Sequence, residues 1–249
     1  MSQRTLIYGF HAVLSRLRNS PSSIQVIYLD AGRQDKRAND VRRQAEERGV
    51  KCVSSEAARL DEMSHGKSQG VVAFVEPIQL ARHLDDVLED LAEPALLLAL
   101  DGVTDPHNLG ACLRSADAFG AHAVIAPKDR AAGLGATAIK AASGAADSVP
   151  YIPVTNLART LRELKARDIL VVGADQHGPL TVADVDFSGP AALVLGAEGS
   201  GLRRLTREHC DALVRIPMFG QVESLNVSVS AGVCLYEARR QRGFGEAGG

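Results

Sequence analysis

The chain has 249 residues, of which 45% are hydrophobic and 23% charged, and its formal net charge is −2. This composition is typical of a soluble globular protein with one large or two modest domains. No apolar run approaches the roughly 20 residues that a membrane-spanning helix needs, and the N-terminus lacks the apolar core of a secretion signal. The four cysteines and seven histidines are scattered, which argues against a disulfide framework and against a metal site, and favours the cytoplasm.

Charge is distributed unevenly along the chain. Residues 1–75 hold 12 Lys and Arg against 8 Asp and Glu, residues 76–94 hold 1 against 6, and residues 95–249 hold 15 against 16. A basic first third, an acidic connector and a near-neutral remainder predict two domains joined by a linker. Phosphate contacts dominate affinity for nucleic acids, so a local basic face suffices for RNA binding. A solvated surface with a chance charge imbalance explains the basic first third equally well.

The first domain, residues 1–75, is predicted to be a small α/β sandwich. Apolar periodicity and the Gly and Pro punctuation predict helices at 8–19, 36–48 and 56–63, and strands at 24–29, 50–53 and 71–75. The second of these helices carries or adjoins a basic cluster formed by Arg33, Lys36, Arg37, Arg42 and Arg43. The acidic segment 76–94 is interpreted as the connector, with a helix expected around 84–91.

The remainder, residues 95–249, alternates buried strands with helices. Strands are predicted at 96–100, 123–126, 169–173, 191–196 and 213–218, and helices at 134–143, 156–167 and 226–241. Segment 149–154 is interpreted as a connection. The alternation predicts a mostly parallel sheet with helices on both faces.

A further helix follows the strand at 96–100. Pro106 precedes a candidate N-cap at Asn108, and Gly120 ends the helix. Arg114 lies off the apolar stripe of this helix, so we expect its side chain to point sideways near the carboxyl end of the preceding strand.

Two of the predicted strands end in loops of glycine, small polar residues and a carboxylate. The first is AALVLGAEGSGL (191–202), and the second leads through IPMFGQVES (216–224) to a helix whose expected N-cap is Asn226. Glycines allow the backbone to turn sharply and to approach a ligand closely. Because ligands bind outside the carboxyl ends of strands in open α/β sheets, these loops are interpreted as two walls of one site.

Neither GxGxxG after a strand nor GxxxxGK[ST] occurs, which disfavours a standard dinucleotide fold and a P-loop, and GxSxG is also absent. Three blocks occur in order instead: DPHNLGACLRSADAFG (105–120), LVLGAEGSGL (193–202) and IPMFGQVESLNVSVSAG (216–232). Together they are far more specific than any one glycine-rich turn.

These three blocks resemble the motifs of the SpoU (TrmH) family of RNA ribose 2′-O-methyltransferases, over nearly all of residues 95–242. Residues 1–75, with YGFHAV near their start and SQGVVA near their end, resemble the family's L30e-like RNA-binding domain. Within the family the chain is most similar to the bacterial enzymes that methylate a guanosine in the peptidyl-transferase region of 23S rRNA. The resemblance therefore implies a methyltransferase that uses S-adenosylmethionine.

The resemblance also implies features that spacing and periodicity do not reveal. The first is a deep trefoil knot in the C-terminal domain, although knots are otherwise essentially absent from proteins. The second is a cofactor site in the loops of the knot, built mostly from backbone groups. The third is a homodimer with the helix at 226–241 in the interface, whose cofactor and RNA sites are completed across the two protomers. Carried onto this chain, the cofactor-binding residues are Leu195, Gly196, Ile216, Met218 and Leu225.

Five polar residues match the family's catalytic positions: Asn108, Arg114, Glu198, Ser224 and Asn226. Arg114 matches an arginine proposed in the family as a general base. Because a guanidinium is effectively always protonated, we expect it instead to hold an RNA phosphate and stabilise the developing alkoxide. The two asparagines are expected to orient the arginine or the ribose. Glu198 is expected to form an ion pair with Arg114 or to accept the proton.

Other interpretations stay open at the sequence level. The asparagines are also good N-caps, Ile216 and Leu225 are also good core residues, and Glu198 alone is compatible with a plain surface carboxylate. His107 and Glu223 lie beside these positions, but the family pattern assigns them no role. The same chemistry on a tRNA or on another rRNA nucleotide is the nearest alternative function. An RNA-binding ribosome-assembly factor without catalysis is the alternative of another class.

Overall fold

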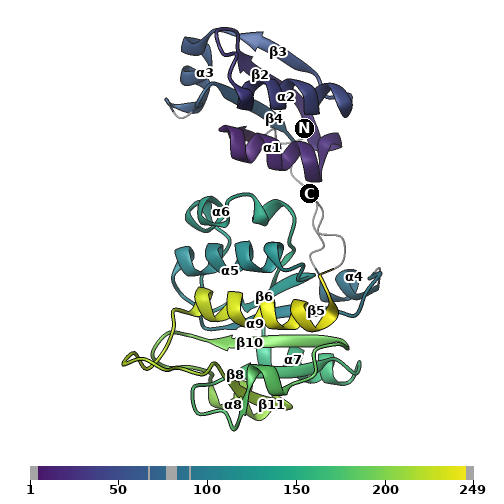
Figure 1. The fold of residues 1–249 in the computed structure, drawn as a ribbon, viewed down its shortest axis with the longest axis vertical. Helices are drawn as coiled ribbons and strands as arrows, with labels where there is room; N and C mark the ends of the chain where they lie inside the picture. Colours follow the sequence, from purple (N-terminus) through teal and green to yellow (C-terminus); the bar gives the residue numbers. More distant parts are fainter. Residues whose placement is uncertain (1–4, 67, 77–82, 90, 245–249) are drawn as a thin grey trace. The chain divides into compact units, whose positions relative to one another are not determined.

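The structure, a computed structural model, describes residues 5–66, 68–76, 83–89 and 91–244. The chain folds into two compact units, residues 1–79 and 80–249 (Figure 1). Residues 77–82 and 90 of the acidic connector expected at 76–94 lie outside the described residues.

The first unit is a four-stranded sheet with helices packed on it. The strands lie in the order β1-β4-β2-β3; β4 is antiparallel to both neighbours, and β2 and β3 are parallel. Its core includes Phe10, Leu17, Ile27 and Leu29, which are almost fully buried. The elements are β1 (Thr5–Tyr8), α1 (Phe10–Asn19), β2 (Ile24–Asp30), α2 (Lys36–Glu47), β3 (Cys52–Ser55), α3 (Ala57–Ser64) and β4 (Val71–Val75).

Helix α2 shows how the basic cluster is built. The Asp35 side chain caps the helix by accepting from the backbone N–H groups of Arg37 and Ala38. Ala38 packs inward, while most of the cluster faces solvent. Arg43 forms ion pairs with Asp40 and Glu47 on the same helix, so part of the predicted positive charge is neutralised locally.

The second unit is built on a seven-stranded parallel sheet with the strand order β7-β6-β5-β10-β8-β11-β9. This confirms the predicted α/β class. Its strands are β5 (Leu96–Asp101), β6 (Ala123–Pro127), β7 (Tyr151–Val154), β8 (Leu170–Ala174), β9 (Leu180–Thr181), β10 (Ala191–Gly196) and β11 (Ala212–Arg215). Its helices are α4 (Leu84–Glu89), α5 (Pro106–Ala118), α6 (Ala136–Ala142), α7 (Leu157–Lys165), α8 (Arg204–Glu208) and α9 (Val227–Arg242).

Both faces of this sheet are covered. Leu96, Leu98 and Leu100 of β5 pack in one core with α5, α6 and α9, whereas Leu97 and Ala99 pack in a second core with α4 and α7 (Figure 1). Because side chains alternate across a strand, a strand buried on both faces is apolar throughout, which is why β5 and β10 are continuous apolar runs.

Four of the predicted boundaries were wrong. The helix expected at 8–19 begins at Phe10, because residues Thr5–Tyr8 form β1 beside β4. The segment expected to be a connection contains strand β7, which pairs with the edge of β6. The strand predicted at 213–218 ends at Arg215. The strand predicted at 50–53 is β3, Cys52–Ser55, shifted by two residues.

The N-cap predicted at Asn108 was also wrong. Asp105 caps α5 by accepting a hydrogen bond from the backbone N–H of His107 at 2.8 Å, and Pro106 occupies the first turn. Proline is favoured there because the first helical N–H has no partner within the helix. The helix therefore starts earlier than expected, and the Asn108 side chain is free for another role.

Candidate active site

The carboxyl ends of four parallel strands meet at one edge of the larger sheet. Strands β5 and β10 run side by side there, with Gly196 opposite Asp101, and β8 and β11 adjoin them on the other side. The loops that leave β8, β10 and β11 surround a cavity of about 630 Å³. Its position matches the rule for ligand sites in α/β sheets, and its size lies within the usual range for small-molecule sites.

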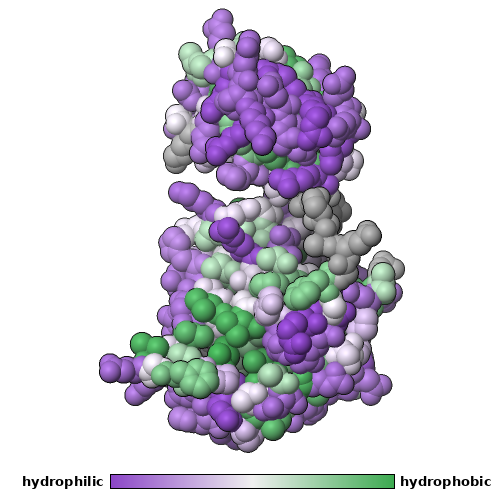
Figure 2. All heavy atoms as spheres, in the orientation of Figure 1, coloured by the Kyte–Doolittle hydropathy of each residue, from purple (hydrophilic) through white to green (hydrophobic). Residues whose placement is uncertain are grey.

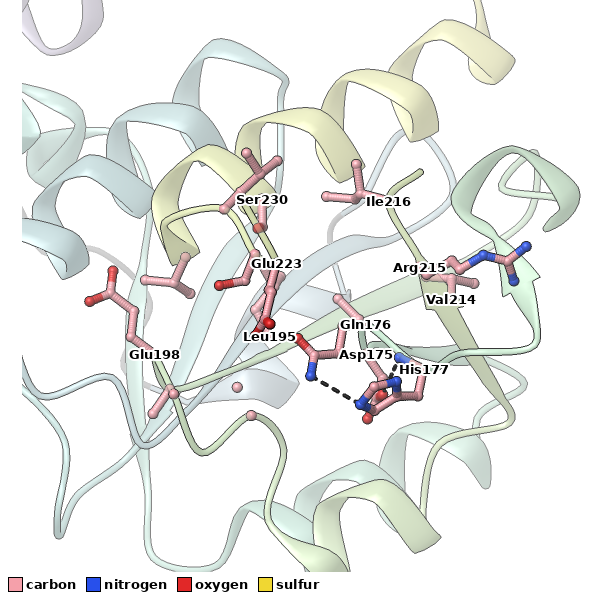
Figure 3. A pocket seen from close by; sticks show the side chains of 18 of the residues that line it. Asp175, Gln176, His177, Leu195, Glu198, Val214, Arg215, Ile216, Glu223 and Ser230 are labelled. Carbon is pink, nitrogen blue, oxygen red and sulfur yellow. Dashed lines mark hydrogen bonds between the residues drawn. The ribbon is translucent and has the colours of Figure 1, made fainter. Parts of the chain in front are cut away.

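All five residues predicted to bind the cofactor line this cavity: Leu195, Gly196, Ile216, Met218 and Leu225. Leu195 and Gly196 end β10, and the other three belong to the loop between β11 and α9. The two loops therefore do form walls of one site (Figure 3). The lining combines apolar side chains with glycine-rich backbone.

The loop after β10 folds back tightly over the end of its own strand. Ala197 and Gly201 form an antiparallel bridge, in which the Gly201 N–H donates to the Ala197 carbonyl at 2.9 Å. A Cβ atom on Gly196 would lie 2.0 Å from the Gly201 carbonyl carbon, so only glycine permits this close return. The turn places Glu198 near its tip.

Glu198 belongs to a triangle of hydrogen-bonded side chains, which we call the Glu198 triangle (Asn108, Glu198 and Asn226). Glu198 Oε1 accepts from Asn108 Nδ2 at 3.1 Å and from Asn226 Nδ2 at 2.5 Å. Asn226 Nδ2 also lies 3.0 Å from Asn108 Oδ1. The triangle thus joins α5, the loop after β10 and the start of α9.

Asn226 has two roles at once. As predicted, it caps α9, since its Oδ1 accepts from the Ser228 N–H at 2.9 Å and from the Ser228 hydroxyl at 2.6 Å. Its amide nitrogen is thereby turned toward Glu198. Capping and site formation are therefore not alternatives for Asn226.

Arg114 and Ser224 lie outside the Glu198 triangle. Arg114 is exposed on α5 and forms no hydrogen bond or ion pair with any described residue. The ion pair considered for Arg114 and Glu198 is therefore not formed within one chain, nor do the asparagines orient this arginine. Ser224 is exposed and lines the cavity, and so does Glu223 (Figure 3).

A further group of cavity residues was missed by the sequence analysis. Asp175, Gln176 and His177 follow β8 and line the cavity, where Gln176 Nε2 lies 3.0 Å from His177 Nε2 (Figure 3). Asp175 is largely buried and forms an ion pair with Arg207. The signal was present, because the polar run ADQHG directly follows a buried strand, and strand carboxyl ends are where ligands bind.

Two other kinds of chemistry find little support at this site. Burial raises the pKa of the Cys112 thiol to about 12, with a smaller contribution from Glu198, so this thiol stays protonated and unreactive. In the described part of the chain, no three His, Cys, Asp or Glu side chains cluster in a way that would hold a metal ion.

None of the described helices has the length and apolar character needed to cross a bilayer.

Comparison with known families agrees with this geometry. Residues 95–236, which contain the cavity and the Glu198 triangle, match the model of the SpoU rRNA Methylase family. The chain belongs to the SpoU rRNA methylase family. Residues 6–81 match a second model, described as RNA 2′-O ribose methyltransferase substrate binding.

Individual relatives of this SpoU-family chain are similar over almost its whole length. A protein of Ralstonia nicotianae named 23S rRNA (guanosine-2′-O-)-methyltransferase RlmB is 57% identical over 97% of this chain and 98% of its own. The protein of the same name from Bordetella pertussis is 58% identical over 97% and 99%. Among solved structures, the SpoU methyltransferase AviRb of Streptomyces viridochromogenes, in complex with the cofactor AdoMet, is 31% identical with a TM-score of 0.70. That alignment covers 96% of this chain and 90% of AviRb.

Proposed function

We propose that this protein transfers a methyl group from S-adenosylmethionine to the ribose 2′-hydroxyl of a guanosine in the peptidyl-transferase region of 23S rRNA. The observation that carries the proposal is the Glu198 triangle at the rim of the cavity, in a chain more than half identical to relatives named for this reaction. The cofactor proposal is further supported by AviRb, which was crystallised with AdoMet.

The cavity has the chemistry that this cofactor needs. Ile216, Met218 and Leu225 offer an apolar slot for an adenine ring. A Cβ atom on Gly199 or Gly201 would meet no atom within 4 Å, so the backbone there is open to a close-lying ligand. Leu195 and Gly196 supply backbone groups at the strand end. When bound, S-adenosylmethionine supplies an activated methyl group on a sulfonium.

The chain's own contribution begins with Glu198. Its Oε1 accepts both asparagine hydrogen bonds, while its Oε2 has no partner among the residues described. We propose that Oε2 accepts the hydrogen bond of the ribose 2′-hydroxyl and so orients its oxygen toward the methyl group. Such alignment converts a bimolecular reaction into an effectively unimolecular one and can supply several kcal/mol. As the oxygen gains the methyl group it must lose its proton, and Glu198, which is the one carboxylate of the triangle, is proposed to accept that proton at Oε2.

Arg114 is assigned a different task. Its guanidinium is permanently charged and therefore a poor proton acceptor. It is exposed and has no partner in the described structure, so it is available to bind an RNA phosphate bidentately and to stabilise negative charge on the attacking oxygen.

We further propose a homodimer in which Arg114 serves the Glu198 triangle of the partner protomer. Val229, Val233 and Tyr236 form an exposed apolar row on α9, and Figure 2 shows hydrophobic residues gathered over this part of the unit. An exposed patch of this kind is typical of an interaction surface. The trefoil knot, in which the C-terminal segment threads through a loop, is part of the proposal. So are the domain limits 1–75, 76–94 and 95–249, and a cytoplasmic location.

The first test is methyl transfer from labelled S-adenosylmethionine to two purified RNAs. One is unmodified 23S rRNA with the peptidyl-transferase region, and the other is bulk unmodified tRNA. We expect label on the ribose of an rRNA guanosine, and a loss of at least 100-fold in rate for Arg114→Ala.

The other outcomes separate the parts of the proposal. Label on tRNA alone would overturn the substrate and keep the chemistry. Cofactor binding without transfer to either RNA would instead favour an RNA-binding assembly factor.

A further inference from the structure

A buried carboxylate at the carboxyl end of β5 takes no part in the mechanism above. Asp101 ends β5 and is only 1% exposed. Its Oδ2 accepts the backbone N–H of Arg203 at 2.8 Å, and its Oδ1 has no hydrogen-bond partner. A buried charge is costly unless it is paired. The nearest cation is the Arg203 side chain itself, whose Nε lies 3.6 Å from Oδ1.

The Arg203 guanidinium is fixed from three directions. Asp101 holds its Nε side, and Nη2 donates to the carbonyl oxygen of Arg130 at 3.4 Å. It also lies directly over the backbone of Gly102, where an added Cβ atom would be 3.0 Å from Nη2. Gly102 has φ +79°, so both its conformation and the space above it favour glycine.

Although it is held in this way, the Arg203 side chain is 46% exposed. A guanidinium has five N–H donors, and one hydrogen bond to the described protein accounts for Nη2. Nε faces Asp101, so both N–H groups of Nη1 and the second N–H of Nη2 have no hydrogen-bond partner among the described residues. A pre-positioned planar fork with free donors is the arrangement that binds a phosphate bidentately.

The surroundings favour an anionic ligand. Arg130, whose carbonyl oxygen contacts Arg203, is exposed and forms no ion pair with a described residue. The same is true of Lys128 and Asp129, which precede it in the chain. Arg204 differs from its neighbour Arg203, because it is 78% exposed and pairs with Glu208 at 2.6 Å. The two adjacent arginines thus have opposite roles, one paired on its own helix and one held at the edge of the site.

We propose that Arg203 binds a backbone phosphate of the substrate RNA, with Asp101 as the positioning residue that holds its guanidinium. This inference rests on the proposed function. It adds a second contact with an RNA phosphate to the one proposed for Arg114. Arg203 is the N-cap residue of α8, at the end of the loop that carries Glu198. A phosphate bound there would therefore place the RNA chain relative to the carboxylate that orients the ribose.

The test compares Arg203→Gln, Arg203→Lys and Arg204→Gln in the full-length protein. The measurements are filter binding to a 23S rRNA fragment with the peptidyl-transferase region and to tRNA, calorimetric binding of S-adenosylmethionine, and melting temperature. We expect Arg203→Gln to raise the Kd for the target RNA at least tenfold and to reduce the salt slope of log K by about one. Arg203→Lys keeps the charge without the fork and should stay at least threefold weaker than the native protein. Arg204→Gln removes the same charge one residue away and should change the Kd less than twofold.

Three results, besides native RNA affinity in Arg203→Gln itself, would overturn the inference. One is an equal effect of Arg203→Gln and Arg204→Gln, which would indicate non-specific charge. Another is native affinity in Arg203→Lys, which would indicate charge without geometry. The third is a parallel loss of cofactor affinity, which would indicate a purely structural role in the loop. If the native protein binds neither RNA, the proposed function fails as well. If it binds and methylates RNA while Arg203→Gln binds normally, only this inference fails.

Discussion

Glu198 is exposed, yet its carboxylate has a defined orientation. The tight return of the loop at Gly196 sets its backbone, and two amide groups from distant parts of the chain hold one of its oxygens. Exposed side chains normally sample several rotamers, so fixing one removes an entropic cost before substrate binds. The second carboxylate oxygen has no partner among the described residues, and we propose that it binds the ribose. The two asparagines thus preorganise the Glu198 carboxylate.

The Glu198→Gln variant tests this role. Glutamine has nearly the same shape, but it carries no negative charge and has one acceptor oxygen in place of two. We expect kcat for methyl transfer to fall about 100-fold, while the affinity for S-adenosylmethionine stays within threefold of the native value. Single-turnover transfer and calorimetry measure the two quantities separately.

Glu223→Gln is the matched control. Glu223 lines the same cavity but forms no hydrogen bond with the described residues. Its substitution should leave kcat within twofold. Equal losses in the two variants would mean that general negative charge in the cavity matters, and not the oriented carboxylate.

At the scale of elements, the α5 N-terminus shows what sequence reasoning could and could not provide. Asp105-Pro106 is a good signature of an N-cap followed by the first helical residue, and it was the stronger signal. The prediction of Asn108 as the cap was wrong because asparagine and aspartate both cap helices well, and Asp105, three residues earlier, is the cap. What Asn108 does instead depends on Glu198, 90 residues later in the chain. Local patterns do not encode such a contact.

The sheet shows the same division. The individual buried strands could be predicted, because apolar runs bounded by turn residues are local. The insertion of β10 between β5 and β8 could not, because it depends on pairing between segments far apart in the sequence. The family motifs identified both walls of the cavity. The third group, Asp175 to His177 after β8, belongs to none of these motifs, and the fold places it at the cavity.

The opposite edge of the sheet contains a pH-sensitive junction between elements. His122 Nδ1 accepts the backbone N–H of Leu96 at the start of β5 at 3.0 Å, and its Nε2 lies 3.4 Å from Glu93. Glu93 in turn binds Arg239 of α9. Burial lowers the pKa of the His122 imidazole below its ordinary value, assisted by Arg242 and Arg239 and opposed by Glu93. Protonation would also convert Nδ1 from an acceptor into a donor.

This junction should make stability depend on pH. Because the folded pKa of His122 is lowered, its stabilising contribution is complete above the unfolded value of about 6.5 and is lost as the pH falls below it. The melting temperature of the native protein should therefore fall more between pH 7.5 and 5.5 than that of His122→Asn, which cannot titrate. We expect an excess on the order of 2–4 °C, measured by calorimetry at fixed ionic strength. Parallel pH profiles for the two proteins would exclude this role for His122.

At the scale of the whole molecule, one chain does not bring all the predicted catalytic residues together. Asn108, Glu198 and Asn226 meet, but Arg114 makes no contact with them that the described structure records. Three of the predicted catalytic residues thus meet in the Glu198 triangle, while Arg114 lies apart from it on α5. The proposed two-fold dimer, with the exposed apolar row on α9 in its interface, would let each Arg114 approach the other protomer's triangle.

Complementation between two inactive variants tests this arrangement. We consider a heterodimer, isolated through two affinity tags, of one Arg114→Ala protomer and one Glu198→Gln protomer. If Arg114 acts on the partner's triangle, both substitutions fall in one site and the other site is native. The heterodimer should then regain about half of the native methyl transfer, since one of two equivalent sites is intact.

A heterodimer of Asn108→Ala and Glu198→Gln is the matched control. Because these two residues bond within one chain, each of its sites carries one defect, and it should stay inactive. Recovery in the control would show that the triangle is not formed within one chain. A silent Arg114→Ala/Glu198→Gln heterodimer of correct mass would place Arg114 in its own protomer's site, and the arginine would then have to reach Glu198 by a movement of α5.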